Sequence, residues 1–148
     1  MSDPITASPA AFAEDDHALR FGGIRRLYGA RAFARFRTAH VVVVGVGGVG
    51  SWAVEALARS GIGRLTLIDL DDVCVSNVNR QLHALDGTVG RPKVEVLAER
   101  CRAIQPGIEV VEDIAFATPT NLAERIPEDA DHLVDAIDSV VAQAALIS

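Results

Sequence analysis

The sequence predicts an α/β protein with a Rossmann-like, open and mostly parallel sheet and flanking helices. An uninterrupted valine run at residues 41–44 is followed directly by a glycine loop at 45–50. Segments of strand length then alternate with segments of helical spacing, which is the pattern of parallel strands joined through helices. The chain has 148 residues, 49% of them hydrophobic, which is enough for one domain with its own core.

The first forty residues differ from the rest of the chain. Residues 1–16 mix Pro, Ala, Ser and acidic residues without a sustained period, and we expect a disordered leader there. Residues 17–39 contain short helical patches interrupted by glycines at 22, 23 and 29. The arginines of this stretch are Arg20, Arg25, Arg26, Arg31, Arg35 and Arg37. We therefore expect a leader, a basic helical arm over 17–39, and a folded domain over 40–148.

The elements of this domain follow one another closely. Residues 41–44 are apolar without alternation, as in a central parallel strand buried on both faces. After the glycine loop, apolar residues recur at helical spacing as far as Gly61, which predicts a helix packed on the sheet. The remaining predictions are a strand at 64–69, a helix at 92–104, and strands at 108–111 and 133–137. A last helix is expected near Ser139, and because doubly wound domains continue into further strands, we expect the first part of a larger fold.

The glycine loop has the form of a phosphate-binding turn. Gly45, Gly47 and Gly50 occupy the glycine positions of G-x-G-x-x-G, and Gly48 lies between them. The first glycine permits a tight turn, the second lets backbone N–H groups approach phosphate, and the third permits close helix packing. The N-terminus of the next helix adds positive potential. A plain tight turn is the alternative, but strand, loop and helix together favour phosphate binding.

Acidic residues follow the second predicted strand. Asp69 lies about 20 residues after Gly50, where an acid that accepts hydrogen bonds from ribose hydroxyls is expected. The alternative is a solvated carboxylate at a strand end. Asp71 and Asp72 are interpreted more simply as solvated loop acids, although Asp71 remains a candidate for the nucleotide site.

Three further residues suit a metal-bound triphosphate better than a dinucleotide, whose pyrophosphate is held mostly by backbone N–H groups. Lys93 falls in the first turn of a predicted helix, which disfavours a cation unless an anion is near. Arg80 lies in the polar loop 76–81, where solvation is an equal alternative. Asp138 follows the fourth strand, which in the usual order 3-2-1-4 lies beside the first, so it faces the crevice of the glycine loop. A carboxylate there would hold Mg²⁺ against phosphates, unless it only caps the last helix.

Composition argues against several other classes. No apolar stretch approaches the roughly 20 residues of a membrane span, and the N-terminus lacks the order of a signal peptide, so we expect a cytoplasmic protein. Cys74 and Cys101 form no C-x-x-C motif, which favours reduced, structural cysteines. His83 and His132 have no spaced partners and are also interpreted as structural. A net charge of −6 argues against nonspecific binding of polyanions, so contact with a nucleic acid must be local.

From His40 onward the residues resemble the superfamily of ubiquitin-activating-like adenylating enzymes, which includes the ThiF and MoeB proteins. The resemblance is carried by GVGGVGSWAVEALARSGIGRLTLIDLDDVCVSNVNRQ, VGRPKVEVLAERCRAIQP and DAIDS. The segments RFGGIRRLYG and DDVCVSNVNRQLHAL resemble one branch, the tRNA threonylcarbamoyladenosine dehydratases.

The resemblance implies an ATP site. The glycine loop and Asp69 would hold ATP. Asn77, Arg80 and Lys93 would contact its ribose or phosphates, and Asp138 would be associated with Mg²⁺. The implied reaction uses ATP to adenylate the carboxylate of the threonyl group on a modified adenosine of tRNA, after which ring closure expels AMP.

The resemblance also implies partners. Arg26 resembles an arginine that reaches the nucleotide site of the neighbouring subunit in a homodimer. The catalytic candidates are Arg26, Arg80, Lys93 and Asp138. One alternative is adenylation of the C-terminal glycine of a ubiquitin-like sulfur carrier, with a sulfur-transfer partner, and another is a non-catalytic ATP-binding module. An NAD-dependent oxidoreductase is least favoured, because it leaves Arg80 and Lys93 unexplained.

Overall fold

The computed structural model of the chain describes residues 9–138. Its helices and strands are α1 (Pro9–Thr38), β1 (His40–Val44), α2 (Gly50–Arg59), β2 (Arg64–Ile68), α3 (Lys93–Ile104), β3 (Glu109–Asp113), α4 (Leu122–Arg125) and β4 (His132–Asp135). Two short 3₁₀ turns, Val75–Asn77 and Asp86–Thr88, lie in the long connection between β2 and α3. The alternation of helix and strand confirms the predicted α/β class.

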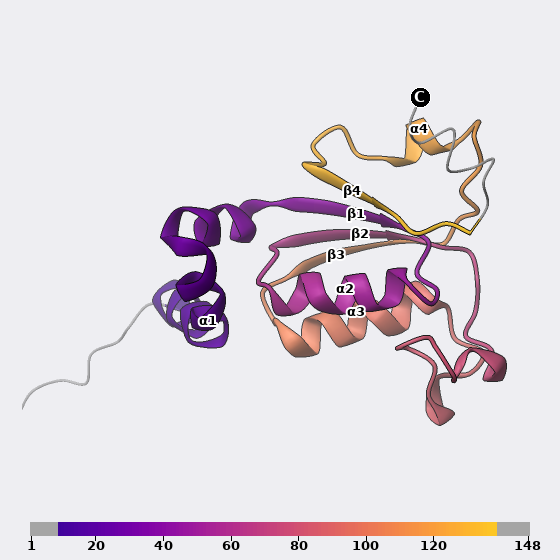
Figure 1. Ribbon diagram of the computed structural model, residues 1–148, viewed down its shortest axis with the longest axis horizontal. Coiled ribbons are helices and arrows are strands. Elements are labelled where there is room, and N and C mark those ends of the chain that lie inside the picture. Colours follow the sequence, from indigo (N-terminus) through magenta and orange to yellow (C-terminus); the bar gives the residue numbers. More distant parts are fainter. Residues whose placement is uncertain (1–8, 139–148) are drawn as a thin grey trace, which may run out of the picture.

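The four strands form one parallel sheet in the order β3-β2-β1-β4. This is the predicted order 3-2-1-4, with β1 between β2 and β4. The connections β1-α2-β2 and β2-α3-β3 place α2 and α3 together on one face of the sheet (Figure 1). The carboxyl ends of β1 and β4 therefore lie side by side, next to the loop that leads into α2.

The central strand is buried on both faces, as its unbroken valine run predicts. Val43 packs with Leu67 in the larger core cluster, beneath α2 and α3. Val42 and Val44 point to the opposite face and pack with Leu122 of α4. Each of these large apolar side chains contributes about 1.5–3 kcal/mol when fully buried, so β1 is firmly anchored in the sheet.

The end of β4 differs from the prediction. The strand stops at Asp135 rather than Ile137, because the N–H of Ile137 donates to Asp135 Oδ1 at 3.1 Å instead of continuing the ladder. The N–H of Ala136 still donates to Val44 O at 2.9 Å, which keeps the segment beside β1. Asp138 thus follows the strand by three positions. The helix expected near Ser139 lies outside the described residues.

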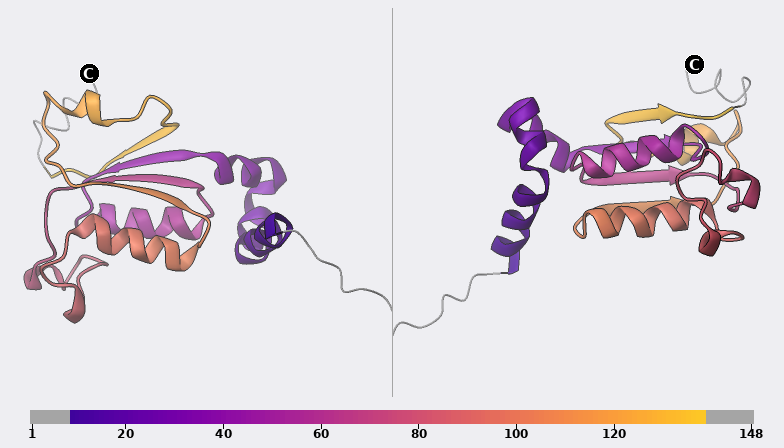
Figure 2. Two further views of the ribbon diagram at one scale, coloured as in Figure 1. Left: turned by 180° about the vertical axis from the view of Figure 1, so that it is seen from behind. Right: turned by 60° about the horizontal axis from the view of Figure 1, so that its bottom comes forward.

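The arm α1 lies at the amino end of the sheet (Figure 2). Its helical geometry breaks at Phe21 and at Gly29, which has a φ of 86°. Phe21 is buried against Gly61, where an added Cβ would lie 3.2 Å from its ring. The described helix begins at Pro9, inside the stretch predicted as a leader, and residues 1–8 lie outside the description. Within residues 9–138, no helix is long and apolar enough to span a bilayer.

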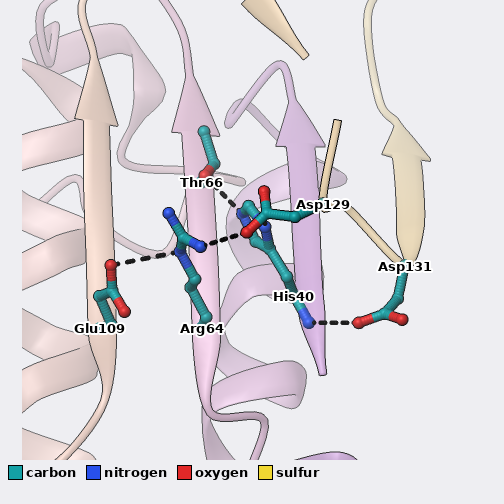
Figure 3. A network of polar contacts seen from close by, with 6 residues as sticks. All are labelled: His40, Arg64, Thr66, Glu109, Asp129 and Asp131. Carbon is teal, nitrogen blue, oxygen red and sulfur yellow. Dashed lines mark hydrogen bonds and ion pairs between the residues drawn. The ribbon is translucent and has the colours of Figure 1, made fainter. Parts of the chain in front are cut away.

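A polar network ties the amino ends of the strands together (Figure 3). The ring of His40 lies between Thr66 Oγ1, 2.8 Å from Nε2, and Asp129 Oδ1, 3.2 Å from Nδ1. Arg64 contacts the same Asp129 at 2.6 Å, and the N–H of His40 donates to Asp131 Oδ2 at 2.9 Å. The network fastens the segment before β4 to β1 and β2, so it fixes the strand that leads to Asp138.

Candidate functional site

The described residues form a cleft of ≈ 480 Å³ at the carboxyl ends of β1, β2 and β4. Open α/β sheets bind ligands at this edge, where the chain connections change direction. The volume falls in the range of small-molecule sites. The predicted residues that line it are Gly45, Gly47, Gly48, Asp69, Asp71, Asn77, Arg80, Lys93 and Asp138. Two predicted residues, Gly50 and Arg26, do not.

Two glycines allow the loop to close. Gly45 has a φ of 83°, and a Cβ there would lie 2.8 Å from Ala136 O of the segment after β4. At Gly50, a Cβ would lie 1.8 Å from Gly45 O, a distance that real atoms cannot reach. Gly50 therefore acts outside the cleft, by letting the start of α2 pack against the end of β1.

The glycine loop presents unpaired N–H groups at the start of α2. Among the described residues, no hydrogen bond uses the N–H of Gly47, Gly48 or Val49, and no side chain caps the helix. Such groups attract anions, because the helix dipole adds positive potential at the same point. All three residues line the cleft, so an anion seated there would satisfy them.

Asp69 is held in a fixed orientation beside the loop. Its Oδ2 accepts a hydrogen bond from the N–H of Val46 at 2.8 Å, and its Oδ1 accepts one from the N–H of Asp71 at 2.8 Å. Each carboxylate oxygen has a second lone pair. Asp69 is therefore positioned to accept hydrogen bonds from two neighbouring hydroxyl groups.

Two cations converge on the same cleft. Lys93 is 5% exposed, although it begins α3, and its Nζ lies 3.3 Å from Asp71 Oδ2. The side chain of Arg80 passes over Gly48, where an added Cβ would lie 3.7 Å from Arg80 Cδ. The indole of Trp52, on α2, donates to Arg80 O at 3.0 Å and anchors this stretch of loop. The arrangement suits a ligand with several negative charges.

Asn77 is buried and has a role in the local fold. Its Oδ1 accepts from the N–H of Cys74 at 2.9 Å, which closes the 3₁₀ turn. Asn77 is also one of the residues that line the cleft. The residue therefore combines a structural contact with a place at the edge of the cleft.

Asp138 is exposed and lines the cleft opposite the helix start. Within residues 9–138 no three His, Cys, Asp or Glu side chains are grouped as a metal site. Mg²⁺ is usually held by one or two carboxylates together with substrate phosphates and water. An exposed carboxylate that lines the same cleft as the glycine loop is therefore compatible with that ion.

Arg26 is not brought to the cleft within one chain. It lies on α1, and its guanidinium passes near Gly22 and Gly23, at 3.9 Å from the Cβ positions of those residues. The arm is at the amino end of the strands (Figure 1), whereas the residues that line the cleft follow their carboxyl ends. Any role of Arg26 at a nucleotide site requires a second copy of the chain.

The cleft also contains residues that the sequence analysis missed. Phe116, which is 64% exposed, and its neighbours Ala115 and Ala117 come from the loop after β3. Gln81 lies next to Gly47 and is 7% exposed. The topology could have indicated them, because every loop that follows a parallel strand lies at the carboxyl edge of the sheet, where the cleft is. Ala115, Phe116 and Ala117 supply an apolar, partly aromatic wall of the cleft, whereas Gln81 adds a polar group beside the glycine loop.

The remaining histidines and cysteines lie outside the cleft. His132 is exposed at the start of β4, whereas His83 is buried beneath the glycine loop. Burial raises the pKa of the Cys101 thiol to about 12, which makes it inert as a nucleophile. Cys74 is exposed and also free. Neither cysteine lines the cleft.

Comparison with known proteins points to one group of enzymes. The model of the ThiF family matches residues 23–147. The tRNA threonylcarbamoyladenosine dehydratase of Haemophilus influenzae is 52% identical over 136 residues, and that of Escherichia coli is 57% identical over 129 residues. A crystal structure of the Escherichia coli enzyme in complex with ATP superposes with a TM-score of 0.86 at 52% identity.

The matches cover most of this chain and part of each relative. They include 90% and 87% of the chain but 51% and 48% of the two dehydratases, and 97% of the chain but 56% of the crystal structure. The chain therefore spans about half the length of the curated relatives it matches. That half contains the whole glycine loop and all of the cleft described above.

Proposed function

This chain belongs to the ThiF family, and from that premise we propose that the whole protein is an ATP-dependent tRNA threonylcarbamoyladenosine dehydratase. The observation that carries the proposal is the cleft itself, in which unpaired N–H groups, two cations and an oriented carboxylate face one space. Relatives that are more than 50% identical have this activity in their names, and one of them binds ATP.

In the proposed complex the phosphates of ATP lie on the N–H groups of Gly47, Gly48 and Val49. Arg80 and Lys93 neutralise the charge of the phosphate chain. The phosphates in turn offset the repulsion between the Lys93 ammonium and the positive end of the helix dipole of α3. Asp69 accepts from the ribose hydroxyls. The adenine would lie along the apolar wall near Phe116.

A divalent ion completes this site. Asp138, which lines the cleft, would hold Mg²⁺ together with phosphate oxygens and water. When bound, Mg²⁺ offsets negative charge on the phosphates. Asp138 itself keeps this side of the cleft anionic.

The proposed reaction activates a carboxylate, which is a poor electrophile, by making it part of a mixed anhydride. A carboxylate oxygen of the threonyl group attacks the α-phosphorus, and the bond to the β-phosphate oxygen breaks with release of pyrophosphate. A nucleophilic atom of the same modified nucleoside then attacks the acyl carbon. The bond from that carbon to the AMP oxygen breaks, and the nucleophile loses its proton to solvent, which leaves the ring and free AMP. Arg80, Lys93 and the dipole of α2 stabilise the charge that builds on the phosphates.

We also propose the wider organisation of the protein. Residues 17–39 form a basic arm beside a nucleotide-binding domain over 40–148, and the leader proposed for residues 1–16 joins the arm through the helix that begins at Pro9. Arg26 of one subunit reaches the ATP of its partner in a homodimer, which accounts for its distance from the cleft in a single chain. The protein works in the cytoplasm, on tRNA.

The test is a reaction with Mg²⁺, ATP and tRNA that carries threonylcarbamoyladenosine. Formation of AMP and loss of one water from the modified nucleoside, followed by mass spectrometry, are expected for the full-length protein. AMP formation with a ubiquitin-like sulfur carrier but not with tRNA would replace this proposal with the carrier reaction. ATP binding without turnover of either substrate would favour a non-catalytic module.

The nucleotide site is tested separately by calorimetric titration with ATP and NAD⁺. Wild type is expected to bind ATP selectively, and Asp69→Ala is expected to lose that binding. Preference for NAD⁺ would contradict the proposal. A matched control is Asp72→Ala, which changes a neighbouring exposed acid that does not line the cleft.

A further inference from the structure

We propose that His83 is a positioning residue for the phosphates. Its Nε2–H holds the carbonyl of Val46 and thereby turns the N–H of Gly47 toward the cleft. The inference rests on the proposed ATP site, and it assigns a role to a residue that the sequence indicated only as structural. His83 does not line the cleft and acts through the glycine loop.

The contact determines which form of the imidazole is present. His83 Nε2 lies 2.8 Å from Val46 O, and a carbonyl oxygen only accepts, so Nε2 carries the proton. His83 is 1% exposed, and its Nδ1 is buried without a hydrogen-bond partner. The ring is therefore a neutral donor with a single bond, and that bond goes to the glycine loop.

The planar peptide between Val46 and Gly47 links this hydrogen bond to the cleft. In a trans peptide the C=O and the following N–H point in opposite directions. Since the Val46 carbonyl points inward to His83, the N–H of Gly47 points outward, toward the cleft that Gly47 lines. No acceptor within residues 9–138 takes this N–H, so it remains available to phosphate.

The loop needs such a restraint because of its own composition. Gly45, Gly47 and Gly48 allow many backbone conformations, and a donor that must be ordered on binding weakens the complex. Val46 is held on both sides, by Asp69 at its N–H and by His83 at its C=O, through residues 23 and 37 positions away. The two side chains thus fix the turn before any ligand arrives.

The surroundings keep the imidazole neutral. Burial is the main cause that lowers the pKa of His83; the Val46 carbonyl opposes it, Lys93 adds to it, and Asp69 opposes it. A second proton would sit on the buried Nδ1, which has no acceptor. The position therefore favours a neutral side chain with one donor.

The experiment compares variants that keep or remove this donor in the intact protein. His83→Leu removes it, whereas His83→Gln places an amide N–H near the position of Nε2. Calorimetry with ATP and with adenosine separates the phosphate site from the base and ribose site. We expect His83→Leu to weaken ATP binding about tenfold, to change adenosine binding less than about twofold, and His83→Gln to restore most of the loss. The control His132→Gln, on an exposed histidine, is expected to bind ATP as wild type does.

The outcomes are distinct. Equal losses for ATP and adenosine in His83→Leu, or wild-type ATP binding by this variant, would overturn the positioning role. If His83→Leu does not fold, His83→Asn replaces it, because its shorter amide does not reach Val46 O, and it is then expected to bind ATP more weakly than His83→Gln. Equal ATP affinities of the Asn and Gln variants would overturn the inference. A folded wild type that binds no ATP would overturn the proposed nucleotide site on which it rests.

Discussion

Lys93, the first residue of α3, is buried with its Nζ 3.3 Å from the Oδ2 of the exposed Asp71. One carboxylate at that distance pairs with the ammonium but leaves N–H donors for a second anion. Replacing Lys93 by Met keeps much of its length and removes the charge. We expect ATP binding to weaken about tenfold or more, and adenosine binding to change little, in calorimetric titrations.

A nearby cation provides the control for this change. Arg91 pairs with Glu99 and does not line the cleft. Arg91→Met is expected to bind ATP as wild type does. Equal losses in the two variants would mean that general positive charge, and not Lys93 itself, attracts the nucleotide.

Gly50 is expected to tolerate no side chain. An alanine Cβ at this position would overlap Gly45 O, so the strand end and the helix start must separate. We expect Gly50→Ala to cost about 3 kcal/mol or more of unfolding free energy, the upper end for overpacking. Denaturant unfolding of Gly87→Ala is the control, because nothing lies within 4 Å of a Cβ there and the same substitution is expected to be neutral.

The pair Glu55 and Arg100 joins α2 to α3. Glu55 is largely buried, and two hydrogen bonds from Arg100, at 2.5 and 2.9 Å, hold its pKa below the usual value, with a further lowering by Arg59. We expect Glu55→Gln to cost about 1–3 kcal/mol in denaturant unfolding at neutral pH. The lowered pKa means that this stability is present above about pH 4.5 and is lost as the pH falls further. The exposed Glu99 is the control, since Glu99→Gln is expected to change little.

Two buried histidines predict a pH dependence of stability. Burial lowers the pKa of His17, with Arg37 adding to the effect, and burial likewise lowers the pKa of His83. The unfolded chain then binds protons that the folded chain does not, so stability is full above about pH 6.5 and falls below it. Thermal unfolding between pH 8 and pH 5 should show this fall, and His83→Gln should reduce it. An unchanged pH profile in that variant would assign the fall to His17 and other groups.

The sequence predicted the sheet well because its signals are local. The valine run of β1 and the helical spacing of α2 and α3 each lie within one element, and their alternation determines the parallel order. Boundaries were less accurate, as in β4, where the backbone N–H of Ile137 donates to the Asp135 carboxylate and the ladder ends. Such bonds depend on the surrounding structure.

Only the part of the candidate site that has a local sequence signal was predicted. The glycine loop and Asp69 belong to a spaced motif, whereas Phe116 and Gln81 have no motif and reach the cleft only through the tertiary arrangement. The role now proposed for His83 depends on one contact with a residue 37 positions away, which no local pattern reports. Arg26 is the opposite case, because the resemblance predicted it but a single chain does not bring it to the cleft.

The position of β4 beside β1 has a consequence for the order in which the protein forms during synthesis. The bond between His40 and Asp131 closes 91 positions of chain, while β1 pairs with β2 through one short helix. Nearby contacts form faster than distant ones, and chains begin folding from the N-terminus as they are made. The strands β1 to β3 with α2 and α3 can thus assemble first, and the wall that carries Asp138 arrives last. A nascent chain would acquire its glycine loop before it acquires the residue proposed to hold the metal.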